Sequence, residues 1–396
     1  MVESGSHDPI LLTGSGRLLL PEAYSGPTPW AIEMRDGRFS FVGALSEAPT
    51  GEAVDLGSSL VTPGLVDAHT HPAFLGDRSD EAAARLAGQP YSGGGILRTV
   101  AATRAGSDED LRAAIGERLR ASLAGGTTTI ECKSGYGLTT AEELRALRLI
   151  EEAAAPLPIR VVRTFLGAHA VPAEAGSMED YVDTVADEML PAIADAGVAE
   201  FCDVFCDRDF FSAAATERIL RAAAALGLGL RLHVDQLTRS GGAELAVRLG
   251  ATSADHLEQL DAAGVAALAG SGTVATLLPG PAIVLRGGLA PARALIEAGV
   301  TVALASDANA GTFGTWGAMP LVIGLGATQL GMTVAEAIAA ATTGGAAALG
   351  LAGRRGVIDV GADADLVAWQ ARHEGAFALH LGSMQPARTW IAGLPA

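Results

Sequence analysis

The sequence is poor in cysteine, with only Cys132, Cys202 and Cys206 among 396 residues. An odd and small number argues against a disulfide framework and fits a reducing compartment, so we expect a cytoplasmic protein. Cys202 and Cys206 stand close together in "FCDVFC", a spacing that a metal pair could use. On a strand they fit better as small buried side chains, which is the interpretation that we favour.

Basic residues are also scarce. The chain has 27 Lys and Arg against 45 Asp and Glu, which gives a formal net charge of −18 at pH 7. Because nucleic-acid binding relies on clustered Lys and Arg, we expect no nucleic-acid partner. A solvated acidic surface is the simplest explanation of the charge, although a cationic partner would also fit it.

Long apolar runs are absent, since none approaches the roughly 20 residues of a membrane-spanning helix. The N-terminal stretch "MVESGSHDPILL" has no basic region followed by a long apolar one. We therefore expect no secretory signal and no membrane partner. Hydrophobic residues make up 49% of the chain, so a sequence of this length can bury a large core. The length of the chain indicates two or three domains, or one large α/β barrel with additions.

The character of the sequence changes twice along the chain. Residues 1–60 have the pattern of strands, and "DG" between two short apolar runs is a strong hairpin signal. Residues 61–352 alternate apolar runs with amphipathic, Ala- and Leu-rich stretches. Residues 353–396 return to strand-like runs such as "GADADLVAW" and "ARTWIAG". We expect the two ends to pair into one small β-sandwich domain beside the middle segment.

The middle segment contains eight strand-like runs. The clearest helical stretches between them are 107–126, 140–155 and 212–227, with Ser107 and Thr140 as N-cap candidates. Eight strand–helix units predict an α/β fold, a (β/α)8 TIM-like barrel. An open doubly wound sheet would need a glycine-rich phosphate loop after the first strand, where this chain has His-Thr-His. The eight runs are residues 60–69, 127–135, 159–169, 199–207, 228–236, 252–260, 273–280 and 300–309.

Polar residues collect where these runs end, which is where a (β/α)8 barrel carries its active site. Five of the chain's eight histidines lie there. The polar residues at the strand ends are His69, His71, Lys133, Ser134, Tyr136, His169, His233, Asp235, Gln236, His256, Asp307 and Asn309.

The spacing of His69 and His71 predicts a metal site. Residues i and i+2 of a strand point to the same face, so both imidazoles face the barrel mouth. Two imidazoles on one face are costly as cations and well suited to one metal ion. His233 and Asp307 would complete a set of three nitrogens and one carboxylate, which suits Zn²⁺ and also Fe²⁺.

Other groups near the predicted mouth are suited to binding a substrate. Arg78 follows the histidine pair in the first loop, where a guanidinium could hold a carboxylate on two atoms. Tyr91, Tyr136 and Asn309 add hydrogen-bonding groups. The runs "SGGGI" and "KSGYG" would let the backbone approach a ligand closely.

These motifs resemble the amidohydrolase superfamily over nearly the whole chain, through "PGLVDAHTH" and the later His, His and Asp. A narrower set, "HTHPAFLGDR", "GGGI", "KSGYGL", "FLGAHAVP", "SADHLE", "LLPG" and "SDANAGT", is similar to the imidazolonepropionase family in the same order. The resemblance implies the metal ligands His69, His71, His233 and Asp307. It also implies the substrate-binding positions Arg78, Tyr91, Tyr136, His169, Gln236, Asn309, Gly311 and Thr312.

The resemblance further implies a reaction, the hydrolysis of 4-imidazolone-5-propanoate to N-formimidoyl-L-glutamate in histidine degradation. Asp307 would move a proton from water to the leaving nitrogen, and His256 would stabilise the oxyanion. Arg78 would hold the propanoate. Because the fourth strand has no Lys to bridge a second ion, we expect one Zn²⁺ or Fe²⁺ per chain. We also expect a small-molecule carboxylate as substrate and a homodimer.

Two other interpretations stay open, since a fold does not fix a function. A different ring hydrolase or nucleobase deaminase of the superfamily would release ammonia from a nucleobase, although a carboxylate-binding Arg78 argues against it. A non-catalytic assembly protein on the same fold would have no need of the four ligands plus His256. It would be purified without a metal.

Overall fold

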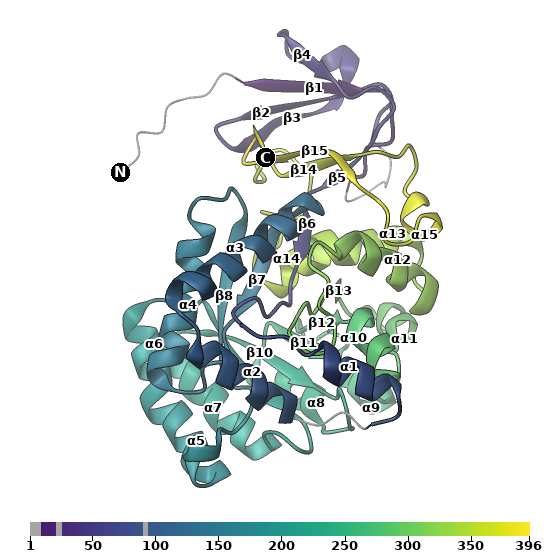
Figure 1. Cartoon of the computed structure of the whole chain (residues 1–396). Coiled ribbons are helices and arrows are strands. Elements are labelled where there is room, and N and C mark those ends of the chain that lie inside the picture. Colours follow the sequence, from purple (N-terminus) through teal and green to yellow (C-terminus); the bar gives the residue numbers. More distant parts are fainter. Residues whose placement is uncertain (1–8, 21–25, 90–93) are drawn as a thin grey trace.

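The computed structural model describes residues 9–20, 26–89 and 94–396, and it has two parts (Figure 1). The larger part is a barrel of parallel strands with helices around it. The smaller part consists of two four-stranded sheets at one end of the barrel. The predicted α/β barrel with an added β-sandwich is therefore confirmed, whereas the domain boundaries near residues 60 and 353 stay predictions.

The eight barrel strands follow one another in chain order, each paired with the next. The first and last approach each other through a parallel bridge between Thr70 and Ala308, and the His71 N–H donates to the Ala308 carbonyl at 2.9 Å. The strands are β6 (Leu65–Asp67), β7 (Thr127–Lys133), β8 (Arg160–Ala168), β9 (Phe201–Cys206), β10 (Gly229–Val234), β11 (Ser253–His256), β12 (Val274–Leu277) and β13 (Val302–Leu304).

One apolar run was predicted incorrectly. Residues 60–69 form two strands, because β5 (Leu60–Pro63) pairs with the small domain and only β6 enters the barrel. The chain turns between them at Gly64, where a Cβ atom would overlap the Thr128 side chain. The apolar pattern continues on both sides of the turn because both strands are buried. The dipeptide Pro63-Gly64 was the available sign of the break.

Both chain ends build the small domain, as predicted. One sheet has the order β3-β2-β1-β4, and the other, β16-β15-β14-β5, joins the C-terminal strands to β5. Asp36 and Gly37 form the tight hairpin with φ angles of 50° and 75°. The remaining strands are β1 (Ile10–Gly14), β2 (Trp30–Arg35), β3 (Arg38–Ala44), β4 (Ala53–Asp55), β14 (Leu366–Trp369), β15 (Pro386–Ile391) and β16 (Leu394–Pro395).

The three helical stretches predicted from the sequence are α3 (Asp108–Ala124), α4 (Thr140–Ala154) and α7 (Ala213–Ala225). Ser107 caps α3 as expected, since its Oγ accepts from the Asp110 N–H at 3.1 Å. The cap of α4 is Thr139 and not Thr140, because Thr139 has the extended backbone of a cap residue and accepts from the Glu142 N–H at 3.3 Å. The prediction was wrong by one residue because both positions are threonine.

Helices cover the outside of the barrel (Figure 1). They are α1 (Ser79–Leu86), α2 (Gly94–Ala105), α3 (Asp108–Ala124), α4 (Thr140–Ala154), α5 (Met178–Thr184), α6 (Leu190–Ala196), α7 (Ala213–Ala225), α8 (Gly242–Leu249), α9 (Ala262–Leu268), α10 (Pro279–Leu285), α11 (Ala292–Glu297), α12 (Met319–Gln329), α13 (Val334–Ala339), α14 (Gly345–Ala348) and α15 (Ala376–Leu379). Short 3-10 or π turns are η1 (Leu45–Glu47), η2 (Ala173–Ala175), η3 (Val185–Met189) and η4 (Ala340–Gly344).

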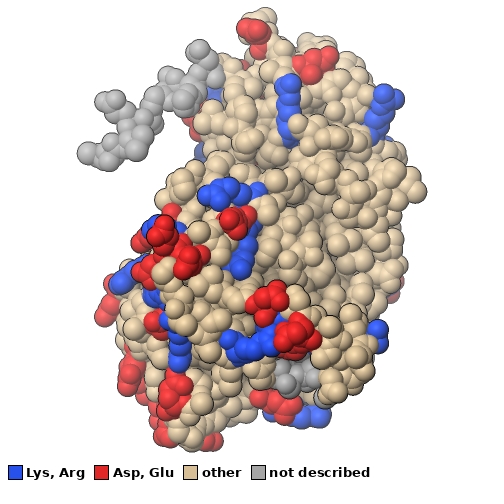
Figure 2. All heavy atoms as spheres, in the orientation of Figure 1, with Lys and Arg blue, Asp and Glu red and all other residues tan. Residues whose placement is uncertain are grey.

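All three cysteines are buried and free. For Cys202 and Cys206, burial was expected from their setting in a strand. Within the described ranges, the helices are too short or too polar for any of them to cross a bilayer. On the face drawn in Figure 2, Lys and Arg side chains lie beside Asp and Glu side chains over the barrel helices.

Candidate metal centre and substrate site

The four predicted metal ligands meet at the carboxyl ends of three barrel strands. His69 and His71 follow β6, His233 belongs to β10, and Asp307 follows β13. Their exposed fractions are only 0%, 3%, 3% and 4%. Asp307 has a left-handed backbone, with φ of 48°, and its N–H donates to the His69 carbonyl at 3.0 Å. Strained backbone of this kind is typical of functional sites.

The ligand atoms face one another at distances that suit a single ion. The Nε2 atom of His69 lies 3.0 Å from the Nε2 atom of His233 and 3.2 Å from the Nε2 atom of His71. The Nε2 atoms of His71 and His233 are 3.4 Å apart. The Asp307 Oδ1 lies 3.3 Å from the His71 Nε2 and 3.8 Å from the His69 Nε2. Four ligands about 2.0–2.1 Å from a tetrahedral ion stand about 3.3–3.4 Å apart. The three nitrogens therefore fit one metal ion, and the Asp307 carboxylate forms a group with His69 and His71 that could hold it.

Three of these residues, His69, His233 and Asp307, are held in the protonation states that a metal binds. Burial lowers the pKa of His69 well below its ordinary value and lowers the pKa of His233 to about 4. Burial by itself would raise the pKa of Asp307, but the hydrogen bond and charge of His71 bring it below normal. Neutral imidazoles and an ionised carboxylate are the forms that coordinate a metal.

Two buried carboxylates orient two of the imidazoles. The Asp255 Oδ2 lies 2.7 Å from the His69 Nδ1, and the Asp203 Oδ2 lies 3.0 Å from the His233 Nδ1. In each case the carboxylate is on the side of the ring away from Nε2, so it fixes the ring with Nε2 directed at the other ligands. We did not predict either residue. The sequence did contain a sign of them, because each is a charged residue inside an apolar run, Asp203 in "FCDVFC" and Asp255 in "SADHLE".

Lys133 lies beneath the metal centre and not at the mouth where the sequence placed it. Its side chain is completely buried, and Nζ contacts Glu131 Oε1 at 2.6 Å and Asp203 Oδ2 at 2.7 Å. Arg231, also completely buried, donates to Asp255 Oδ2 at 2.8 Å. Lys133 thus fixes the carboxylate beside His233, and Arg231 fixes the carboxylate beside His69. The prediction was wrong because strand β7 continues through Lys133, which turns this side chain into the barrel.

His256, the predicted oxyanion-stabilising residue, lies beside the metal ligands. Its ring centroid is 5.2 Å from that of His233 and 5.5 Å from that of His69. The His256 Nδ1 lies 3.3 Å from Glu258 Oε1. Burial by itself would lower the pKa of His256, but the charges of Glu258 and Asp307 raise it above normal. The raised pKa favours the protonated form of His256, in which both ring nitrogens can donate a hydrogen bond.

A cavity of about 30 Å³ opens onto the centre and brings most of the predicted site residues together. The Tyr136 ring packs edge-on against His169, with centroids 5.2 Å apart, and the His169 ring stacks on His71. The His169 Nδ1 lies 2.9 Å from the Gly135 carbonyl, which fixes the ring. The predicted residues that line this cavity are His71, Arg78, Tyr136, His169, His233, Gln236, His256, Asp307, Asn309 and Thr312.

Asn309 also holds its own loop. Its Oδ1 accepts from the N–H groups of Gly311 and Thr312 at 2.7 and 2.8 Å, and its Nδ2 donates to the Asp307 carbonyl at 2.7 Å. These bonds fix the loop that carries a metal ligand. Tyr91, the other predicted substrate-binding residue, lies outside the described residues.

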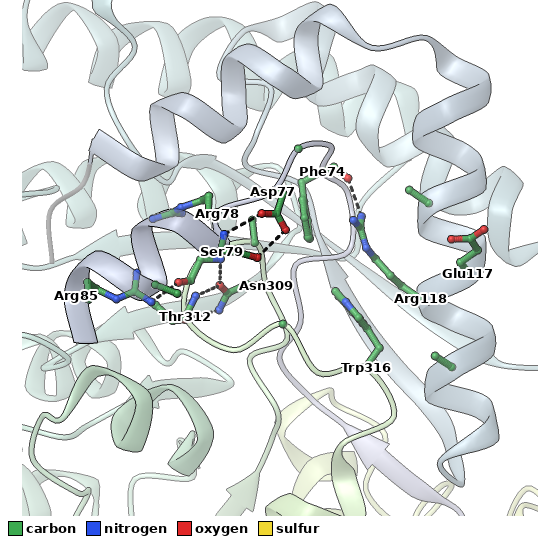
Figure 3. A pocket seen from close by; sticks show the side chains of 17 residues that line it. Phe74, Asp77, Arg78, Ser79, Arg85, Glu117, Arg118, Asn309, Thr312 and Trp316 are labelled. Atoms are coloured by element: carbon green, nitrogen blue, oxygen red, sulfur yellow. Dashed lines mark hydrogen bonds between the residues drawn. The ribbon is translucent and has the colours of Figure 1, made fainter. Parts of the chain in front are cut away.

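A second cavity, of about 580 Å³, lies on the outer side of the same loop (Figure 3). Arg78, Asn309 and Thr312 line both cavities, so they form the wall between them. In the outer cavity, Arg118 stacks 3.6 Å above the Phe74 ring. The outer volume is in the range of small-molecule sites, whereas the inner one has little more room than a water molecule needs.

The fold and the site together define a class of protein. Residues 60–395 match the model of the amidohydrolase family, and the chain belongs to that family. Solved structures share its fold: an adenosine deaminase of Xanthomonas campestris has a TM-score of 0.73 at 21% identity, covering 98% of this chain and 92% of that one. A 5-methylcytosine deaminase of Klebsiella pneumoniae has a TM-score of 0.77 at 17% identity, covering 98% and 97%.

Curated relatives narrow the class. An imidazolonepropionase of Ralstonia nicotianae is 45% identical over 377 residues, which are 92% of this chain and 92% of the relative. One of Rubrobacter xylanophilus is 47% identical over 367 residues, 90% of this chain and 88% of the relative. Within the amidohydrolases, the chain belongs to the imidazolonepropionase family.

Proposed function

We propose that this protein hydrolyses 4-imidazolone-5-propanoate to N-formimidoyl-L-glutamate, as a step of histidine degradation, with one Zn²⁺ or Fe²⁺ per chain. The observation that carries the proposal is the meeting of three imidazole Nε2 atoms and one carboxylate in a buried site that Arg78 also lines. Membership of the imidazolonepropionase family supports the choice of substrate.

The substrate's carboxylate and ring match the chemistry of the groups on the two sides of this site, and binding a ligand of that size requires the cavity of about 30 Å³ to widen. We infer that the Arg78 guanidinium binds the propanoate carboxylate on two atoms, which orients the imidazolone ring towards the ligand histidines. Tyr136, His169 and Gln236 line the cavity and offer hydrogen-bonding groups to the ring or the carboxylate.

Water adds to the ring carbonyl carbon, and the bond from that carbon to the ring nitrogen breaks. When bound, the metal lowers the pKa of a coordinated water to about 7 and polarises the carbonyl. Asp307 accepts a proton from the attacking water and returns it to the leaving nitrogen. His256 donates a hydrogen bond to the oxygen on which negative charge develops. The products are the α-carboxylate and the formimidoyl group of N-formimidoyl-L-glutamate.

The test is metal analysis of the purified protein followed by turnover of freshly generated 4-imidazolone-5-propanoate. We expect about one equivalent of Zn²⁺ or Fe²⁺ and formation of N-formimidoyl-L-glutamate. His69→Ala should lose metal and activity together. Ammonia released from nucleobases, with no turnover of the imidazolone, would favour the deaminase alternative, and a metal-free wild type would favour the assembly protein.

The remaining expectations about partners belong to this proposal. We propose a homodimer in the cytoplasm that acts on a small carboxylate and binds neither nucleic acid nor membrane. Light scattering of the purified chain tests the dimer, and a monomer would contradict it.

A further inference from the structure

Strand β11 ends at His256 in an unusual backbone conformation. The φ angle of His256 is 83° and that of Leu257 is 69°, so two successive residues with side chains are left-handed. Such residues are uncommon outside glycine, and they cluster at functional sites. The end of β10 anchors the turn. The Leu257 N–H donates to the Val234 carbonyl at 3.1 Å, and the next turn residue but one, Gln259, donates its N–H to the Asp235 carbonyl at 2.7 Å.

This turn brings the Glu258 carboxylate to the His256 ring. The Glu258 Oε1 lies 3.3 Å from the His256 Nδ1. The two side chains are 4% and 1% exposed, so water hardly competes for this contact. A group that accepts a hydrogen bond from one ring nitrogen of a histidine sets the direction in which the other nitrogen points. The contact therefore fixes the orientation of the His256 ring.

The Glu258 carboxylate is a poor device for stability. Its Oε2 is buried and has no hydrogen-bond partner in the part of the chain that the structure describes. Burial raises the pKa of Glu258 above normal, although the charge and hydrogen bond of His256 oppose this. A buried carboxylate that is only half satisfied costs stability. An apolar side chain of the same size would suit the fold better, so the carboxylate points to a role in the site.

Glu258 reaches the substrate site through His256. One ring nitrogen of His256 lies within 4.8 Å of a ring nitrogen of His69 and of one of His233. His256 lines the inner cavity, whereas Glu258 is not among the described residues that line it. Glu258 can therefore act on a reaction in this cavity only by way of the His256 ring.

We propose that Glu258 is a positioning residue for His256. Its carboxylate accepts the hydrogen bond of the Nδ1–H group and holds the ring so that the Nε2–H group donates to the oxyanion. The inference rests on the proposed function, in which His256 stabilises that charge. A donor that is not held in place stabilises a transition state less. Because the oxyanion forms only during the reaction, the effect belongs to kcat and not to substrate binding.

A comparison of single and double variants tests this role, with the full chain loaded with Zn²⁺. Glu258→Met keeps the size of the side chain and removes the hydrogen-bond acceptor. It should lower kcat for 4-imidazolone-5-propanoate about 10- to 100-fold per bound zinc, the scale seen for groups that orient metal-site imidazoles, and change KM less than about twofold. In a His256→Ala background the same substitution should change kcat less than about twofold, because no ring remains to be positioned.

Two further variants provide the controls. Glu258→Gln has an amide that can bond to Nδ1 through its oxygen or its nitrogen, so its kcat should stay at least about threefold above that of Glu258→Met. Equal losses in these two variants would overturn the role of the hydrogen bond. Glu33→Met makes the same change in strand β2 of the small domain, where Glu33 is 8% exposed against 9% for Glu258. It should keep the wild-type kcat.

A spectrum of the zinc-loaded protein without substrate adds a measurement that does not depend on activity. In wild type labelled with ¹⁵N-histidine, the Nδ1–H proton of His256 should give a signal, because the buried contact protects it from exchange with water. His256→Ala assigns this signal by its absence. Glu258→Met should lose the signal, while the signals of the three ligand histidines stay in place.

The outcomes separate this inference from the proposed function. If wild type turns over the imidazolone and Glu258→Met keeps the wild-type kcat, or loses as much in the His256→Ala background, the positioning role is wrong while the reaction stands. Loss of zinc by Glu258→Met would show that Glu258 supports the metal centre itself, which also overturns the role. If wild type does not hydrolyse the imidazolone, the proposed function fails and the Nδ1–H signal decides. Its loss in Glu258→Met would show that Glu258 holds His256 for another substrate, and its persistence would overturn both.

Discussion

The Nδ1 atom of His69 lies 2.7 Å from the Oδ2 atom of Asp255, and both side chains are completely buried. Because the carboxylate accepts a hydrogen bond from the Nδ1–H group, the proton stays on Nδ1 and the Nε2 lone pair is left for a metal. Asp255 is itself held by Arg231 at 2.8 Å, so the direction of the His69 ring is fixed by side chains of two other barrel strands, β10 and β11.

Asp255→Asn should therefore weaken metal binding by about 10- to 100-fold, because an amide fixes the imidazole tautomer less firmly than a carboxylate does. Competition with a chelator of known affinity measures the change. Asp195→Asn, at an exposed position on α6, is the control and should bind metal like wild type. An unchanged affinity in Asp255→Asn would remove this carboxylate from the metal site.

The sequence was informative where chemistry and periodicity coincide. The same-face spacing of His69 and His71 predicts two imidazoles that face one another, and their Nε2 atoms are 3.2 Å apart. The eight apolar runs separated by helical stretches predict the barrel. This pattern can be recognised without knowing the register in which neighbouring strands pair. Histidines at strand ends could be grouped because parallel strands of a barrel end on one face.

Contacts across strands could not be predicted in the same way. The pairing of Asp255 with His69 joins β11 to the end of β6, and a single sequence does not contain the register that brings them together. Lys133 was placed at the mouth because it ends an apolar run. Lys133 stands two residues after Glu131, so both side chains point to the same face of the strand. Because strand β7 extends as far as Lys133, that side chain points into the barrel beneath the metal centre and not into a loop at the mouth.

Asp307→Asn should lower kcat by about 10²- to 10⁴-fold, because it removes the proposed proton carrier while keeping the size of the side chain. Asp307 also faces the His71 Nε2 at 3.3 Å, so metal content must be measured and rates expressed per bound ion. Turnover near the wild-type value at full metal occupancy would show that another group moves the proton.

The N-terminus of α13 should make a stability contribution that depends on pH. The hydrogen bond from Arg293 and the Thr333 N–H lower the pKa of Glu336 to about 2, against an opposing effect of partial burial. A lowered carboxyl pKa stabilises the folded state above the ordinary value of 4.5, and this contribution is lost as the pH falls towards 2.

Glu336→Gln keeps the capping-box hydrogen bond but loses the charge, so it should lower the free energy of unfolding at pH 7 by about 0.3–1 kcal/mol. The difference in Tm from wild type should shrink as the pH falls from 4.5. Arg293→Met removes the ion-pair partner of Glu336. When Glu336→Gln is added to Arg293→Met, the Tm difference between the double and the single variant should depend less on pH than the difference measured in wild type. A difference that stays constant down to pH 3 would contradict the assignment.

Lys133→Met should destabilise the protein severely and weaken the metal site as well. Lys133 contacts Glu131 and Asp203 at 2.6 and 2.7 Å, and all three side chains are completely buried. Burial by itself would lower the pKa of Lys133, but the two carboxylates raise it above normal, so the ammonium stays charged. Removing one partner of a buried ion pair leaves an unpaired charge, at a cost of about 3–5 kcal/mol.

Chemical denaturation and zinc competition measure these two effects of Lys133→Met separately. Zinc affinity should fall because Asp203, which lies 3.0 Å from the His233 Nδ1, loses the cation that holds it. Adding Glu131→Gln should recover part of the stability by removing one of the two unpaired charges. Arg112→Met breaks the exposed pair with Glu152 and should cost about 0.2–1 kcal/mol, with zinc affinity unchanged. If Lys133→Met lowers the free energy of unfolding no more than Arg112→Met does, the buried ion pairs of Lys133 do not stabilise the barrel.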